Sequence, residues 1–218
     1  METAKKGDFI ELDYTGKLED GTVFDTTIEG IAKANDLEKE GHSYKPLVVC
    51  VGKGHLLKGL DKHIDGKEVG KTYNVKLSPE DSFGKKSAEL IQLISTSKFR
   101  KEKMQPAPGL QVNIDGVIGV VKTVTGGRTL VDFNHPLAGR NLDYEFTIRR
   151  ILIDDNEKLN AMISLFGLDA SALVENETAR ISSAQEIPEE FRKKFSEDVK
   201  EAIPSIKNIE FSVKPTGQ

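Results

Sequence analysis

Cysteine and histidine, which often act as nucleophiles, proton carriers or metal ligands, are few in this chain of 218 residues. Cysteine occurs once, as Cys50, which excludes a disulfide framework and a cysteine-rich zinc or iron–sulfur site. Because Cys50 lies in an apolar run, it is expected to be a small buried hydrophobic residue rather than a reactive thiol. His135 is a conceivable metal ligand, but a structural or surface role is favoured, since the other histidines are scattered through the first third: His42, His55 and His63.

Aromatic rings and one acid form a second group of candidates. Tyr14 and Tyr144 fall in alternating, strand-like segments, and Phe24 precedes Asp25 in a short run, GTVFD. Taken by themselves, such rings are typical of a protein core, and an aspartate after a strand is typical of a turn or cap. The residues alone therefore leave both a structural and a functional interpretation open.

Composition restricts the class of protein. With 30% charged and 37% hydrophobic residues and a net charge of −4, the chain is expected to be globular and cytoplasmic rather than disordered. No apolar run approaches the roughly 18 residues of a membrane helix, and the amino-terminal residues lack the apolar stretch of a signal peptide. The acidic balance does not indicate nucleic-acid binding, and the basic run KFRKEK is more typical of a solvated helix face or turn.

The elements that would position these residues are mostly strands. Alternation predicts strands in DFIELDYTG, KTYNVKLSP and NLDYEFTIRRI, and the apolar run 46–52 predicts a buried strand. Asp20-Gly21 predicts a hairpin turn, residues 26–45 a loop or short helical excursion, and 55–66 a helix that ends at Gly66. These patterns predict an α+β fold in which a curved antiparallel sheet wraps a short helix and leaves an apolar pocket.

Two further segments differ from this body. Residues 85–133 contain eight basic and four acidic residues, net +4, and predict a small β meander with its own turns. Residues 155–218 contain eight basic and twelve acidic residues, net −4, and predict a helix, a strand, a second helix beginning at Pro188 and a last strand, which together form a small α/β unit. The predicted domains are therefore 1–84 with 134–154, 85–133, and 155–218.

Four sequence pieces, in order, resemble the FKBP-type peptidyl-prolyl isomerases, specifically the SlyD-like members with a domain inserted in the flap. They are GTVFD at 21–25, VGKGHLLKGLD at 51–61, SPEDSFG at 78–84, and VDFNHPLAGRNLDYEF at 131–146. The last is the most specific, because NH-x-LAG-x-NL closes the inserted domain in this subgroup. The resemblance covers residues 1–154, and residues 155–218 are similar to an appended domain of long FKBPs of archaeal type.

The resemblance implies catalysis of rotation about X-Pro bonds, without a nucleophile, metal or cofactor. It assigns the catalytic positions to Tyr14, Phe24, Asp25, Leu57 and Tyr144, with the Leu57 N–H and the Asp25 carboxylate facing substrate carbonyls. The remaining wall of the pocket is implied to consist of Leu47, Leu56, Leu60, Phe83 and Leu137. The chain ends in SVKPTGQ rather than in the histidine-rich tail of SlyD, so no metal site is predicted.

Three positions depart from the family's usual pattern. Leu60 stands where many relatives have tryptophan, Phe83 where tyrosine is usual, and Tyr144 where phenylalanine is usual. The smaller side chain of Leu60 at the pocket floor and the missing hydroxyl at Phe83 put the strength of catalysis and of macrolide-drug binding in question. They motivate the alternative that the chain is a holdase, a peptide-binding module with weak or no isomerase activity.

Residues 85–133 resemble the inserted chaperone domain, which implies binding of unfolded, proline-containing polypeptides. The candidate contact residues are apolar, although most inward residues of so small a unit must form its own core: Ile91, Leu93, Ile94, Phe99, Met104, Leu110, Val112 and Val117. Residues 155–218 are short for an independent core, which predicts docking either on the body or on a second copy. The second alternative would make a homodimer through this domain.

Overall fold

The computed structural model describes residues 2–39, 41 and 43–213. Part of the predicted loop 26–45 and the end of the predicted C-terminal domain lie outside the described residues. The chain divides into two compact units, Met1–Leu77 with Leu142–Gln218, and Ser78–Asn141. The predicted insert, 85–133, lies within the second unit, and the predicted C-terminal domain shares the first unit with the body.

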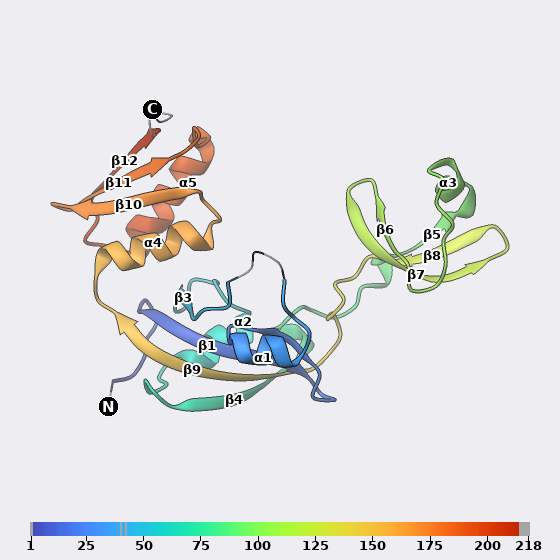
Figure 1. Cartoon of the computed structure of the whole chain (residues 1–218), viewed down its shortest axis with the longest axis horizontal. Coiled ribbons are helices and arrows are strands. Elements are labelled where there is room, and N and C mark those ends of the chain that lie inside the picture. Colours follow the sequence, from blue (N-terminus) through green and yellow to red (C-terminus); the bar gives the residue numbers. More distant parts are fainter. Residues whose placement is uncertain (1, 40, 42, 214–218) are drawn as a thin grey trace. The chain divides into compact units, whose positions relative to one another are not determined.

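A five-stranded sheet forms the body of the first unit (Figure 1). Its order is β2-β1-β9-β4, and β3 pairs with the amino-terminal half of β1, all in antiparallel fashion. The strands and helices of the body are β1 (Phe9–Leu18), β2 (Val23–Thr26), α1 (Glu29–Ala34), β3 (Leu47–Cys50), α2 (Lys58–Ile64), β4 (Thr72–Leu77) and β9 (Leu142–Leu152). Short helices on an antiparallel sheet confirm the predicted α+β class.

The predicted helix over 55–66 is shorter in the structure, because residues 51–57 form a turn and a loop before α2 begins. Within α2, Gly59, Leu60 and Ile64 are buried, and the chain leaves the helix through Gly66 at φ +78°. This left-handed conformation is one that glycine adopts without the steric cost of a Cβ. The apolar face of α2 thereby packs inward, with its charged residues outward.

The carboxy-terminal part of the first unit contains a three-stranded sheet covered by two helices. Its elements are α4 (Asp155–Leu165), β10 (Ala170–Glu175), β11 (Thr178–Ser183), α5 (Glu189–Ala202) and β12 (Asn208–Val213). β11 and β12 pair in parallel across α5, as the strand–helix–strand pattern predicts. The additional strand β10, which pairs with β11 in antiparallel fashion, was not predicted.

The second unit contains a four-stranded antiparallel sheet of order β5-β8-β7-β6. Its core is small and contains Phe99, Val112, Val121 and Val131. Its elements are two single 3₁₀ turns, Pro79–Asp81 and Ala88–Leu90, followed by β5 (Ile91–Ser95), α3 (Thr96–Lys101), β6 (Gln111–Ile114), β7 (Val117–Thr125) and β8 (Arg128–Asp132).

Asn134 joins the two chain segments at the base of this second unit. Its side-chain oxygen accepts a 2.8 Å hydrogen bond from the N–H of Ser87, and its amide nitrogen donates a 3.0 Å bond to the Ser87 carbonyl. The same amide donates to Asp132, whose carboxylate also lies 3.5 Å from Lys86 and 3.7 Å from Lys122. Where the insert ends, the side chain of Asn134, the asparagine of the NH-x-LAG-x-NL motif, thus makes the two hydrogen bonds to the Ser87 backbone that a neighbouring strand would otherwise make.

Candidate active site

Tyr14 and Asp25 are brought together by the pairing of β1 with β2. Gly16 lies opposite Asp25 in the register, two residues after Tyr14 on the same face of β1. The Tyr14 hydroxyl donates a 2.8 Å hydrogen bond to the Asp25 carboxylate, whose side chain is exposed at this edge. Burial, together with the negative charge of Asp25, raises the pKa of the Tyr14 hydroxyl. The hydroxyl therefore stays protonated and holds the carboxylate in one orientation.

Tyr144 belongs to β9, which pairs with β1 along the edge opposite β2, and it lies opposite Gly16 in the register. Its ring is 6.0 Å from that of Tyr14 and 5.8 Å from that of Phe24, which it meets edge to face. Burial raises the pKa of the Tyr144 hydroxyl, and Asp25 adds to the shift. Three rings and one carboxylate from three strands thus form a single aromatic cluster.

Gly16 makes this cluster possible, and the sequence analysis missed it. A Cβ at this position would lie 2.7 Å from Cζ of Phe24 and 3.1 Å from Cε1 of Tyr144. A glycine inside a strand pattern often marks such a close approach, which was the available signal.

The leucines of the predicted wall come from β3, α2 and the loop between them. Leu60 is buried at 2% exposure, whereas Leu47, Leu56 and Leu57 are half-buried. Leu57 is the residue at the start of α2, with φ −55° and ψ 139°, and among the described residues none accepts a hydrogen bond from its N–H. This N–H is therefore a candidate donor to a bound peptide.

Phe83 and Leu137 belong to the second unit. The Phe83 ring stacks on the His135 ring at 4.2 Å with an interplanar angle of 2°, and His135 also accepts a hydrogen bond from the Leu137 N–H. These contacts give His135 a structural role within its unit. The part that Phe83 and Leu137 take in substrate binding stays a prediction.

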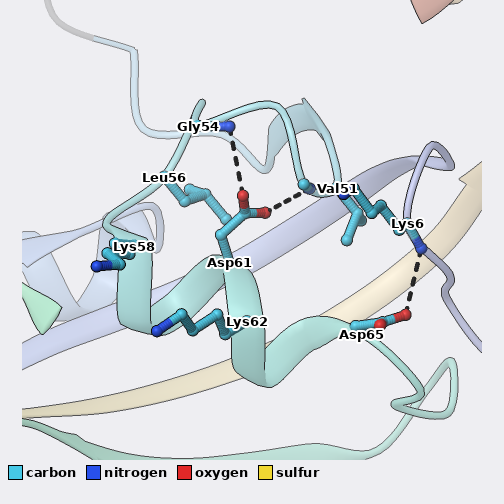
Figure 2. A pocket seen from close by; sticks show the side chains of 9 residues that line it. Lys6, Val51, Gly54, Leu56, Lys58, Asp61, Lys62 and Asp65 are labelled. Atoms are coloured by element: carbon cyan, nitrogen blue, oxygen red, sulfur yellow. Dashed lines mark hydrogen bonds between the residues drawn. The ribbon is translucent and has the colours of Figure 1, made fainter.

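A cavity of about 640 Å³ lies beside α2 in the first unit (Figure 2). Of the predicted pocket residues only Leu56 lines it, and the remaining wall contains three lysines and two aspartates. A smaller cavity of about 290 Å³ adjoins Tyr144, Val75 and Lys17. We place the candidate site at the aromatic cluster because a proline ring requires apolar walls, whereas five of the nine residues that line the cavity beside α2 are charged.

In the described part of the chain, no three histidine, cysteine or carboxylate side chains group in a way that could hold a metal ion. No helix in the described ranges has the length and apolar character needed to cross a membrane.

Comparisons with known proteins point to one family. The family model of the FKBP-type peptidyl-prolyl cis-trans isomerases matches residues 1–102, and that of the FKBP26 IF domain matches residues 92–137. The short-type peptidyl-prolyl cis-trans isomerase of Methanocaldococcus jannaschii is 33% identical over 153 residues, which cover 70% of this chain and 97% of that protein.

Bacterial relatives show the same likeness. The FKBP-type 16 kDa peptidyl-prolyl cis-trans isomerase of Escherichia coli is 30% identical over 69% of this chain and 95% of its own length. The SlyD of Aeromonas hydrophila is 29% identical over 69% of this chain and 65% of its own length. These matches show that the chain belongs to the FKBP-type peptidyl-prolyl cis-trans isomerases, as a SlyD-like member.

Proposed function

We propose that the aromatic cluster of Tyr14, Phe24 and Tyr144, with Asp25 and the Leu57 N–H, is the site at which this isomerase rotates X-Pro bonds. The uncatalysed barrier is about 20 kcal/mol and reflects loss of amide resonance in the twisted state. The twisted amide is less polar than the planar one, so an apolar, water-poor pocket favours it. The single observation that carries the proposal is the Tyr14–Asp25 hydrogen bond beside two further rings.

Each group has a definite task in this proposal. The three rings enclose the prolyl ring, and the Leu57 N–H binds a substrate carbonyl and so fixes one side of the rotating bond. The Asp25 carboxylate, oriented by Tyr14, faces the dipole of the carbonyl that turns. No covalent bond to the substrate forms at any stage.

The test is acceleration of cis–trans exchange in a short peptide with one Leu-Pro bond, measured by NMR at micromolar protein. The parent is expected to accelerate exchange, and the double variant Tyr14→Ala, Asp25→Ala is expected to lose most of the effect with its fold intact. If the parent barely isomerises and the double variant still protects an unfolded client as well as the parent, the holdase alternative replaces this proposal.

We further propose that the second unit binds unfolded chains through one face of its sheet. The side chains of Leu93 and Ile118 are 56% and 57% exposed. Leu93 of β5 pairs with Leu130 of β8, and Ile118 of β7 pairs with Asn113 of β6. Within the ranges that the structure describes, β5 pairs on one side only, with β8, which leaves its other edge for an added strand. An exposed apolar face beside an open edge suits extended apolar segments.

Burial divides the predicted contact residues into two groups. Ile91, Leu93, Leu110 and Val117 are exposed. Ile91 and Leu93 lie on the proposed face, whereas Val117 is next to Ile118 in β7 and pairs with the core-side Ile114, which places it on the opposite face. Phe99 and Val112, each 3% exposed, form the core of the unit together with the partly buried Ile94 and Met104. So small a unit needs these side chains for its own stability, and we remove Phe99 and Val112 from the proposed client surface.

Self-association through residues 155–218 stays a separate proposal, as does a cytoplasmic location. Leu173 and Val213 are half exposed on the strands of this region, which supports a contact with a second copy. Light scattering on the full chain tests it, and a mass per particle equal to 24.1 kDa would contradict it.

A further inference from the structure

The loop between β3 and α2, residues 51–57, contains Leu57, whose N–H belongs to the proposed isomerase site, and Leu56, which the family resemblance assigns to the wall of the pocket. Asp61 of α2 holds it from one side, since its carboxylate accepts hydrogen bonds from the N–H of Gly52 at 2.8 Å and of Gly54 at 3.3 Å (Figure 2). At its base, the Cys50 N–H donates a 3.1 Å hydrogen bond to Nδ1 of His55. The loop therefore has several fixed points within its own fold.

The C-terminal part of the chain holds the same loop from another side. Nζ of Lys53 lies 2.6 Å from the carboxylate of Glu201 on α5, and the Lys53 side chain is only 26% exposed. A cavity of about 380 Å³ is shared by the loop and the two C-terminal helices, with Lys53 and His55 on one side and Met162, Phe166 and Asp198 on the other. The loop is thus placed between α2 and the C-terminal helices.

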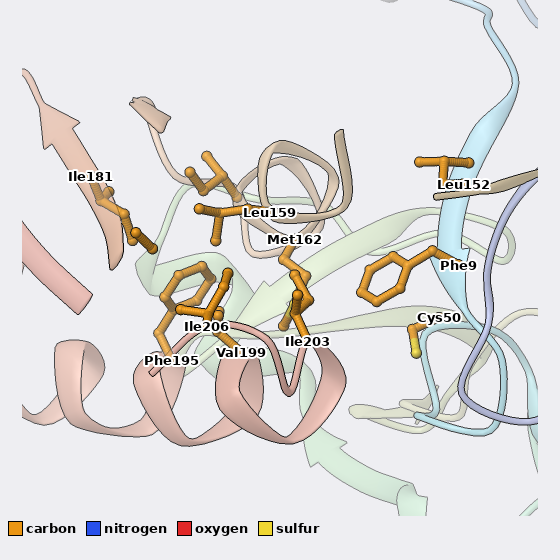
Figure 3. Packing of buried hydrophobic residues seen from close by; sticks show 12 residues of the cluster. Phe9, Cys50, Leu152, Leu159, Met162, Ile181, Phe195, Val199, Ile203 and Ile206 are labelled. Carbon is orange, nitrogen blue, oxygen red and sulfur yellow. The ribbon is translucent and has the colours of Figure 1, made fainter. Parts of the chain in front are cut away.

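The contact continues in a shared hydrophobic core. Phe9, Cys50 and Leu152 of the body belong to the same buried cluster as Met162 and Ile203 of the C-terminal part. Figure 3 shows Met162 and Ile203 next to the Phe9 ring, with Cys50 beyond it, while Ile181 lies at the far end of the cluster. Cys50, fully buried, immediately precedes the loop, so this core anchors the loop at its start.

We infer that the C-terminal part, through Glu201 and the core around Phe9 and Cys50, is a positioning element for the isomerase site. The inference rests on the proposed function, because it concerns how Leu56 and the Leu57 N–H are held. Small misplacement of groups that orient a substrate is costly in rate. When the contact between the C-terminal part and the loop is weakened, the loop is in its binding-competent arrangement for a smaller fraction of the time. The apparent affinity for the substrate then falls in proportion to that fraction.

Charge variants test the ion pair. Glu201→Lys places a second positive charge beside Lys53 and is expected to raise KM about threefold with kcat unchanged, in line with the modest strength of exposed ion pairs. Glu197→Lys, on an exposed position of the same helix, is the control and is expected to leave both constants unchanged. The double variant Lys53→Glu, Glu201→Lys restores the pair with its charges exchanged and is expected to restore KM.

Core variants test the shared cluster, with Cys50 as a built-in reporter. Since Cys50 is the chain's only cysteine and fully buried, its labelling by Ellman's reagent measures opening of this contact. Ile203→Ala is expected to lower Tm, to speed labelling and to raise KM about tenfold. Ile181→Ala is expected to lower Tm about as much as Ile203→Ala does, with KM unchanged. A simple loss of folded molecules would instead lower the apparent kcat at constant KM.

Two outcomes overturn the inference. One is faster Cys50 labelling in Glu201→Lys or Ile203→Ala with KM and kcat both unchanged. The other is unchanged labelling and unchanged KM in both variants, because docking would then not depend on these contacts. A parent chain without isomerase activity contradicts the proposed function itself, and it is recognised from the parent alone, before any variant is compared.

Discussion

The Tyr14 hydroxyl donates a 2.8 Å hydrogen bond to the Asp25 carboxylate across the β1–β2 pair. Both residues were candidates from the sequence, but nothing in their spacing shows that they touch. The contact gives the tyrosine a task that a phenylalanine ring of the same size could not perform. It also separates the site from an ordinary aromatic core, in which a carboxylate would be unfavourable.

Removal of this hydrogen bond is expected to weaken catalysis without unfolding the chain. Tyr14→Phe keeps the ring and deletes the donor to a charged acceptor, so kcat/KM on a Leu-Pro peptide should fall about tenfold. Asp25→Asn should give a loss of similar size, and the double variant should lose less than the product of the two. Strictly multiplicative losses would mean that Tyr14 and Asp25 act independently.

Substitution of Gly16 is expected to lower isomerase activity as much as substitution of the residues that line the site. Gly16→Ala introduces a Cβ 2.7 Å from the Phe24 ring, which must then shift away from Tyr144. Isomerase activity should fall at least fivefold, on the scale of about 1 kcal/mol for a disturbed ring contact. Gly30→Ala is the matched control, since a Cβ there meets nothing within 4 Å and α1 tolerates alanine. Equal activity of the two variants would contradict the assigned close packing.

Stability should depend on the protonation of His55. Burial lowers the pKa of His55 below its usual 6.5, although Asp61 and Asp198 oppose the shift and Lys53 adds to it. The unfolded chain therefore binds a proton at this residue where the folded chain does not, so the free energy of unfolding falls as pH drops below about 6.5.

The comparison that isolates this contribution is urea unfolding of the parent and of His55→Asn between pH 5 and pH 8. Asparagine places an acceptor oxygen near the position of Nδ1, which accepts from the Cys50 N–H. The stability difference between parent and variant should shift in favour of the variant as the pH falls. A difference that does not change with pH would show that His55 titrates alike in the folded and unfolded chains.

Client binding by the second unit should depend on its exposed sheet face. The double variant Leu93→Ser, Ile118→Ser removes two side chains that are more than half exposed, so the fold should be little affected. Suppression of aggregation of a reduced, unfolded protein should drop severalfold, while turnover of a short Leu-Pro peptide should stay the same. Val124→Ser, a 36% exposed position whose register partner is the buried Thr129, is the control. Equal protection by all three proteins would remove this face from the proposal.

Much of the fold could be predicted because hydrophobic alternation is strong in β1, β4 and β9, and because Pro188 marks the start of α5. β10 was missed, since its inward residues include Ala170 and Ala172, which give weak hydrophobic contrast. The union of Phe9 and Cys50 with the C-terminal core could not be predicted, because apolar periodicity shows that a residue is inward but not which element covers it.

The site was predictable in its residue types but not in its contacts. The register of β1 shifts between Gly16 and Lys17, and such an irregularity decides which side chains of β1 and β2 meet. In the second unit, the sequence marked Phe99 and Val112 as apolar without separating the core from the exposed face. The pairing of β6 with β7 places Val112 on the core side, whereas Phe99 lies in α3 and is buried by packing against the sheet.

The most direct test of the account is the rate of cis–trans exchange at a single Leu-Pro bond, measured by NMR with the parent, Tyr14→Phe and Gly16→Ala at equal concentration. The account predicts clear acceleration by the parent and a loss in each variant, with all three chains folded by circular dichroism. A folded parent that leaves the exchange rate at its uncatalysed value, or variants that match the parent, would contradict it.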